Sequence, residues 1–97
     1  MWILQSPEFQ PDVLTFRLSP GAVKTIGRAT NADLILDAPL VSRVHCRLSA
    51  NDETLEVVDL DSTNGTYVNG ERVCRAHLIP GDRLKVGRVE LAVGRTG

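Results

Sequence analysis

The chain has 97 residues, of which 42% are hydrophobic and 24% charged, and its net charge at pH 7 is −1. This composition is typical of one soluble globular domain and excludes a disordered chain. The near-neutral charge gives no general attraction to nucleic acids or acidic membranes, and no apolar run approaches the roughly 18 residues of a membrane-spanning helix.

Short segments rich in aliphatic and β-branched residues follow one another along the chain, separated by turn signals such as "SPG" (19–21) and "PGD" (80–82). We expect strands, in chain order, at 2–5, 13–18, 23–27, 33–36, 44–50, 54–60, 72–74, 83–87 and 89–94. Several of them alternate apolar and polar residues, and no stretch has apolar residues at helical spacing. Roughly ten short strands without helices predict an all-β sandwich or barrel forming a single domain, residues 1–97.

The segment "DLDSTNGTYVNG" (59–70) contains two Asn-Gly pairs, at 64–65 and 69–70. Asn-Gly favours the two-residue hairpin turn in which both central residues have a positive φ. The acidic and hydroxyl residues of the segment also invite comparison with an EF-hand calcium loop. The register is wrong, however, because counting from Asp59 puts Asn64 where that loop needs glycine and Gly70 where it needs glutamate. We therefore do not expect a calcium site.

Two further patterns suggest chemistry on a weaker basis. His45 adjoins Cys46, but neighbouring residues on a strand point to opposite faces and cannot easily share a metal ion. We expect no metal site, and two free thiols at Cys46 and Cys74. Ser42 and His45 could belong to a serine hydrolase, yet the sequence supplies no convincing orienting carboxylate or oxyanion hole.

Polar side chains suited to binding an anion occur where three expected strands begin or end. They are Arg28 after Gly27, Ser42 and Arg43 in "SRVH", and Thr63 and Asn64 in "STNG". A sandwich gathers its loops at two ends, so these residues could meet there. Guanidinium groups match phosphate oxygens, and hydroxyl and amide donors would complete the shell. A few such charge-assisted bonds, at about 1.5–3 kcal/mol each, could support micromolar binding.

The ordered set of "GR" (27–28), "SRVH" (42–45), "STNGTYVNG" (62–70) and "GDRLKVG" (81–87) resembles the forkhead-associated (FHA) domain family. The resemblance implies a β-sandwich of eleven mostly antiparallel strands with ligand loops at one end. It also implies binding of phosphothreonine proteins or peptides, with no catalysis and no cofactor. A phospho-independent scaffold domain is the main alternative, and a serine hydrolase using Ser42 is the third.

The resemblance also assigns roles to single residues. Arg28 and Ser42 would contact the phosphate, and Arg43 would add a further basic contact. Thr63 would line the pocket near the phosphothreonine, and Asn64 would form a hydrogen bond with the peptide backbone.

The remaining implied roles are structural or concern specificity. His45 would brace the loops, and four residues would shape turns: Gly27, Gly65, Asn69 and Gly70. Leu40, two residues before the phosphate-binding serine, would favour an aliphatic residue at the third position after the phosphothreonine. We expect Asp61, beside the pocket, to face solvent, because an inward carboxylate would repel phosphate.

The N-terminal residues 1–5 lack the basic start and the long apolar stretch of a signal peptide. We therefore expect an intracellular domain, cytoplasmic or, in a eukaryote, nuclear, that is monomeric in isolation. Its expected partner is a phosphothreonine-containing protein, and neither nucleic acid nor membrane is expected to bind.

Overall fold

The computed structural model describes residues 1–6 and 14–96, and this part of the chain contains eleven β-strands. The strands are β1 (Trp2–Gln5), β2 (Thr15–Leu18), β3 (Val23–Gly27), β4 (Leu34–Ile35), β5 (Cys46–Ala50), β6 (Leu55–Asp59), β7 (Thr66–Val68), β8 (Glu71–Val73), β9 (Arg75–Leu78), β10 (Arg83–Val86) and β11 (Val89–Arg95). No helix occurs among these residues that is long and apolar enough to cross a membrane.

The strands form two sheets. One sheet has six strands in the order β2-β1-β11-β10-β7-β8, and the other has five in the order β4-β3-β5-β6-β9. Neighbours pair antiparallel, except that β3 and β4 pair parallel through Ile26 with Leu34 and Gly27 with Ile35. The prediction of an all-β sandwich with about eleven mostly antiparallel strands is confirmed.

The core lies between the sheets because period-two alternation sends one face of each strand inward. In β5, Cys46, Leu48 and Ala50 are buried, whereas Arg47 and Ser49 are half-buried on the other face. The largest fully buried side chains come from both sheets and include Trp2, Leu4, Leu18, Ile26, Leu48, Leu55, Leu84 and Leu91. This core gives the loops a rigid frame.

Strands β7 and β9 were not expected from the sequence, and β2, β4, β5 and β6 begin later than expected, with Leu14 preceding β2 and Asp33 preceding β4. Val44 and His45 precede β5, Thr54 precedes β6, and residue 13 of the expected 13–18 strand lies outside the described residues. Strands β8 and β9 belong to different sheets, so the chain crosses from one sheet to the other at Cys74. No glycine or proline marks this crossing, and residues 75–78 contain no β-branched residue and no Phe, Tyr or Trp, so the sequence does not indicate β9 as a strand of its own.

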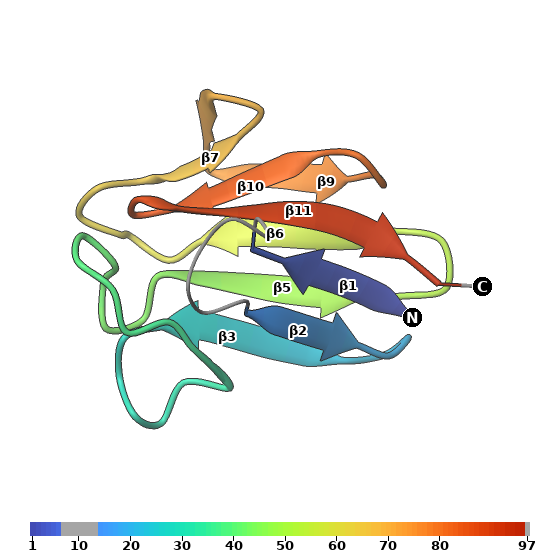
Figure 1. Ribbon diagram of the computed structural model, residues 1–97, viewed down its shortest axis with the longest axis horizontal. Coiled ribbons are helices and arrows are strands. Elements are labelled where there is room, and N and C mark those ends of the chain that lie inside the picture. Colours follow the sequence, from blue (N-terminus) through green and yellow to red (C-terminus); the bar gives the residue numbers. More distant parts are fainter. Residues whose placement is uncertain (7–13, 97) are drawn as a thin grey trace.

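The connections that carry the candidate residues lie together at one end of the sandwich. Figure 1 shows the green connection between β3 and β5 and the yellow connection after β6 at the left end, with both chain termini at the right end. Antiparallel pairing of β3 with β5 and of β5 with β6 places the end of β3, the start of β5 and the end of β6 side by side. The three polar segments therefore meet.

Candidate functional site

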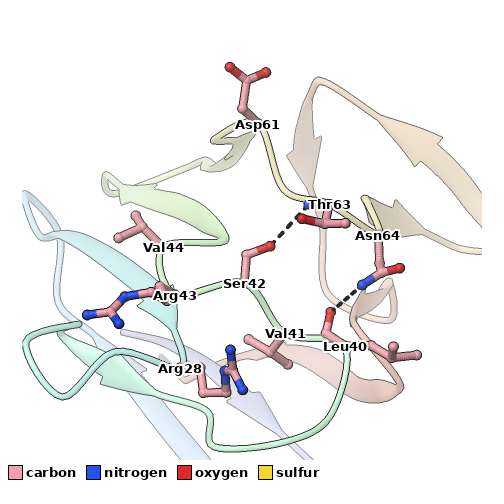
Figure 2. A pocket seen from close by; sticks show the side chains of 9 residues that line it. All are labelled: Arg28, Leu40, Val41, Ser42, Arg43, Val44, Asp61, Thr63 and Asn64. Carbon is pink, nitrogen blue, oxygen red and sulfur yellow. Dashed lines mark hydrogen bonds between the residues drawn. The ribbon is translucent and has the colours of Figure 1, made fainter.

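A hollow of about 510 Å³ opens at the loop end of the sandwich. It is lined by Arg28, Leu40, Val41, Ser42, Arg43, Val44, Asp61, Thr63 and Asn64 (Figure 2). All the residues expected to contact a phosphopeptide, and Leu40, thus lie around one opening. Val41 and Val44 were not singled out from the sequence, because isolated valines beside a predicted strand carry no signal of ligand contact.

Ser42 lies at the centre of the hollow and is already oriented by a neighbouring loop. The backbone N–H of Thr63 donates to Ser42 Oγ at 3.1 Å (Figure 2). Because the hydroxyl oxygen accepts this bond, the hydroxyl proton is left to donate to a ligand. The contact also joins the loop before β5 to the loop after β6.

Asn64 holds the opposite side of the hollow. Its Nδ2 donates to the carbonyl oxygen of Leu40 at 3.1 Å (Figure 2). Leu40 has a φ of 70°, a left-handed conformation that a leucine adopts only at some strain. The bond from Asn64 helps to hold this conformation, while the amide oxygen and the second N–H proton of Asn64 remain available to a peptide backbone.

The two arginines are fixed through their backbones while their side chains reach into solvent. The N–H of Arg28 donates to the Ser42 carbonyl at 2.9 Å, and the N–H of Ala29 donates to the Arg43 carbonyl at 3.1 Å. Both arginine side chains are exposed. Within the described residues no carboxylate lies within 4 Å of either guanidinium, so both are free to bind an anion.

Gly27 makes this close approach possible. A β-carbon at this position would lie 2.0 Å from the carbonyl oxygen of Arg43, a separation that real contacts do not show. Gly27 is not among the glycines with a positive φ. The expectation that it shapes a turn therefore needs correction, because what its position requires is the absence of a side chain rather than an unusual backbone angle.

His45 connects the loops from the interior. It is fully buried; its Nδ1 accepts the N–H of Ser42 at 3.0 Å, and its Nε2 lies 2.8 Å from the carbonyl oxygen of Gly65. An amide N–H can only donate and a carbonyl can only accept, so the proton is on Nε2. The ring thus ties the Ser42 loop to the Gly65 loop.

The hydrogen bonds of His45 argue against the hypothesis of a serine hydrolase that uses Ser42. A catalytic histidine must take the proton of the serine hydroxyl through a free ring nitrogen. Both ring nitrogens of His45 are occupied by backbone groups, and the contact with Ser42 is made to its N–H and not to its hydroxyl.

Asp59 holds the loop that carries Thr63 and Asn64. Its carboxylate accepts hydrogen bonds from the Ser62 hydroxyl, the Thr66 hydroxyl and the Ser62 N–H. Partial burial opposes ionisation, but these three donors outweigh it and hold the pKa of Asp59 below its usual value. The anionic form of Asp59 is therefore the one that stabilises this loop.

The two Asn-Gly pairs differ in conformation. Asn69 and Gly70 have φ values of 51° and 85° and connect β7 to β8, as in a type I′ hairpin turn. In the first pair only Gly65 has a positive φ, at 90°, so Asn64 is not part of such a turn. The first pair presents a side chain at the hollow, and the second folds the chain.

Asp61 is exposed, with a φ of 55°. It lines the rim of the hollow, and its carboxylate points away from Ser42 and the arginines in Figure 2.

The two cysteines are not among the residues that line the hollow. Cys46 and Cys74 are free thiols, the first buried and the second exposed. Burial is the main cause that raises the pKa of Cys46 to about 12, so its thiol stays protonated at neutral pH. Across residues 1–6 and 14–96, no three histidine, cysteine or acidic side chains are grouped so as to hold a metal ion.

Comparison with known protein families shows the family of the chain. Residues 24–87, which include all the segments around the hollow, match the sequence profile of the FHA domain. The chain belongs to the FHA domain family. The resemblance noted in the sequence is thereby confirmed, and the four quoted segments all fall within the matched region or at its edge.

Three relatives illustrate the similarity. An ABC transporter ATP-binding/permease protein of Mycobacterium tuberculosis is 43% identical over 82 residues, which cover 84% of this chain and 9% of the transporter. The glycogen accumulation regulator GarA of the same species is 40% identical over 70 residues, covering 72% of this chain and 43% of GarA. A solved structure from work on phosphothreonine-dependent FHA domain interactions has a TM-score of 0.84 and 30% identity, with 99% of this chain and 97% of that chain covered.

The chain therefore spans less than half the length of these two curated relatives. Membership in the FHA family indicates an interaction domain.

Proposed function

We propose that this domain is a phosphothreonine-dependent interaction module that binds its partner at the hollow around Ser42 and catalyses no reaction. The observation that carries the proposal is the meeting of the Arg28 and Arg43 guanidiniums, which no carboxylate of the described residues pairs, with the hydroxyl of Ser42 in one opening. The solved FHA domain with 30% identity, studied for phosphothreonine-dependent interactions, supports the same reading.

The chemistry of a phosphate fits these groups. A phosphate monoester carries a charge of about −1.5 to −2 at pH 7 and three acceptor oxygens. Two guanidiniums can neutralise that charge, and the hydroxyl proton of Ser42 can donate to a third oxygen. In this arrangement Thr63 lies beside the phosphothreonine, and Asn64 offers its amide oxygen and an N–H to the peptide backbone.

The loops need little rearrangement to bind, because they are already joined to one another. Ser42 accepts from the backbone of Thr63, Asn64 donates to the Leu40 carbonyl, and His45 bridges the two loops from below. A site that is ordered before binding avoids much of the entropy loss of ordering its ligand groups.

A titration with pools of phosphothreonine peptides, each matched to an unphosphorylated pool, tests the proposal. We expect binding only of the phosphorylated pools. Arg28→Ala should weaken binding at least tenfold, because one charge-assisted phosphate contact is worth about 1.5–3 kcal/mol. Arg17→Ala, which removes an exposed arginine from β2, is the matched control and should leave the dissociation constant unchanged.

Two outcomes would contradict the proposal. Equal binding of phosphorylated and unphosphorylated pools would favour the phospho-independent scaffold function. An unchanged dissociation constant for Arg28→Ala, with the same melting temperature as wild type, would show that the phosphate binds elsewhere.

A further inference from the structure

A second hollow adjoins the first on the other side of the arginines. It has a volume of about 370 Å³ and is lined by Arg28, Ala29, Thr30, Asp37 and Arg43. Arg28 and Arg43 line both hollows, so a ligand held by the two guanidiniums lies next to both openings. Asp37 and Thr30 are exposed and belong to the second hollow alone.

The carboxylate of Asp37 has no structural task in the described residues. It accepts no hydrogen bond there, and no basic group lies within 4 Å of it, although it shares a hollow with two arginines. Five other acidic side chains are bound by hydroxyl, amide or basic groups: Asp33, Asp59, Asp82, Glu56 and Glu90. Asp52, Glu53, Asp61 and Glu71 also have no such partner in the described residues, but among the acidic residues only Asp37 is part of the described lining of the second hollow. Asp37 therefore remains available to a ligand.

The balance of charge changes when phosphate binds. In the free domain the two hollows carry the positive charges of Arg28 and Arg43 and the negative charges of Asp37 and Asp61. A phosphate with a charge of about −1.5 to −2 offsets both guanidiniums and leaves the two carboxylates without compensation. A cationic group on the same ligand would restore the balance, and the second hollow is where a carboxylate and a hydroxyl can receive it.

We propose that the second hollow is a subsite for a lysine or arginine side chain of the phosphothreonine partner, with Asp37 as its charge-selecting residue. The inference rests on the proposed function and deepens it, because it defines the partner class as phosphothreonine segments that also carry a nearby basic residue. The ammonium or guanidinium donates to the carboxylate of Asp37 and to the hydroxyl of Thr30. Asp61 adds favourable charge at the rim but lies outside the second hollow.

Peptide pools with a central phosphothreonine and four degenerate positions on each side test this subsite. Lysine is fixed at one position at a time, and a parallel pool has methionine there, which has a stem of similar length and no charge. The proteins are wild type, Asp37→Asn and the control Asp52→Asn. Asp52→Asn removes the same negative charge as Asp37→Asn. Asp52 is exposed and lies beside Met1 and Thr96 at the other end of the sandwich, far from both hollows.

For wild type and Asp52→Asn, we expect lysine at one or more positions to strengthen binding over methionine by roughly two- to fivefold, as a solvent-accessible ion pair does. In Asp37→Asn this gain should disappear, and in wild type it should shrink as salt is raised. Equal melting temperatures of the three proteins would show that folding is unaffected.

Several results would overturn the inference while leaving the proposed function intact. They are a lysine gain that persists in Asp37→Asn, the lack of a lysine gain at every position, and a uniform strengthening of all phosphorylated pools by Asp37→Asn. The last result would mean that Asp37 merely repels phosphate. If wild type binds phosphorylated and unphosphorylated pools equally, the proposed function fails, and the inference fails with it.

Discussion

Replacement of Gly27 by alanine would place a β-carbon 2.0 Å from the carbonyl oxygen of Arg43, 2.8 Å from its carbonyl carbon and 3.0 Å from the Cα of Val44. All three neighbours are backbone atoms, so no side chain can rotate away. To reach the 3.0 Å that real contacts need, the end of β3 and the Arg43 carbonyl must separate by about 1 Å.

That separation acts on the hydrogen bonds that join the two segments. The Arg28 N–H to Ser42 carbonyl bond, 2.9 Å, and the Ala29 N–H to Arg43 carbonyl bond, 3.1 Å, both flank the collision. Weakening two backbone bonds costs about 1 kcal/mol each, and forced overpacking adds about 1–3 kcal/mol. We therefore expect a loss of about 3–5 kcal/mol in the free energy of unfolding, which lowers the melting temperature by roughly 12–40 °C in a domain of this size.

The same movement separates Arg28 from Ser42, so phosphopeptide affinity should fall at least tenfold, by the loss of about one charge-assisted contact. Thermal unfolding followed by circular dichroism and a phosphopeptide titration well below the melting temperature would measure the two effects. Gly70→Ala is the control. Gly70 has a φ of 85° but nothing within 4 Å of an added β-carbon, so this variant should lose only about 1–2 kcal/mol and keep its affinity.

The reasoning would be refuted if Gly27→Ala kept the melting temperature and the affinity of wild type. Backbone proximity at Gly27 would then not be what positions Arg28 against Ser42.

Three further predictions follow from the site. The pKa of Asp59 is held below its unfolded-state value, so its contribution to stability is complete above about pH 5 and is lost as the pH falls through the folded-state value. Asp59→Asn should therefore be less stable than wild type near neutral pH. Between pH 6 and 3 its free energy of unfolding, measured with urea, should fall by less than that of wild type. Phosphothreonine should bind roughly fourfold more tightly than phosphoserine in matched peptides, since one buried methyl contributes about 0.8 kcal/mol, and equal affinities would contradict a pocket beside Thr63 that accepts the methyl. Leu40, whose side chain is 44% exposed at the rim, should favour an aliphatic residue at the third position after the phosphothreonine. On a peptide array, Leu40→Arg should move this preference to acidic residues without loss of phosphate dependence. Strong selection of aspartate at that position by wild type would count against the assignment.

Much of the fold could be read from the sequence because it depends on local rules. Leu84 and Val86 alternate with Arg83 and Lys85, a pattern that predicts a strand with one buried face and one exposed face. In β10 the apolar pair is buried and the basic pair is exposed. Asn69 and Gly70 both adopt the positive φ values that an Asn-Gly hairpin turn requires. The motifs around Arg28, Ser42 and Asn64 indicated the family because their order and spacing along the chain are together specific, and the family match over residues 24–87 confirms it.

What depends on contacts between distant segments was decided only by the tertiary structure. The crossing of the chain between sheets at Cys74, which makes β8 and β9 separate strands, has no turn residue to mark it. The proton on Nε2 of His45 follows from backbone groups of Ser42 and Gly65, and the latter lies 20 residues away.

The site itself shows the same division. The sequence supplied the residue types that bind phosphate, and it did so because strand ends and turn residues are local features. The need for glycine at position 27 and the place of Asp37 beside the two arginines come from how closely the loops approach one another. That distance is set by the packing of two sheets on a shared core, and no local pattern in the chain encodes it.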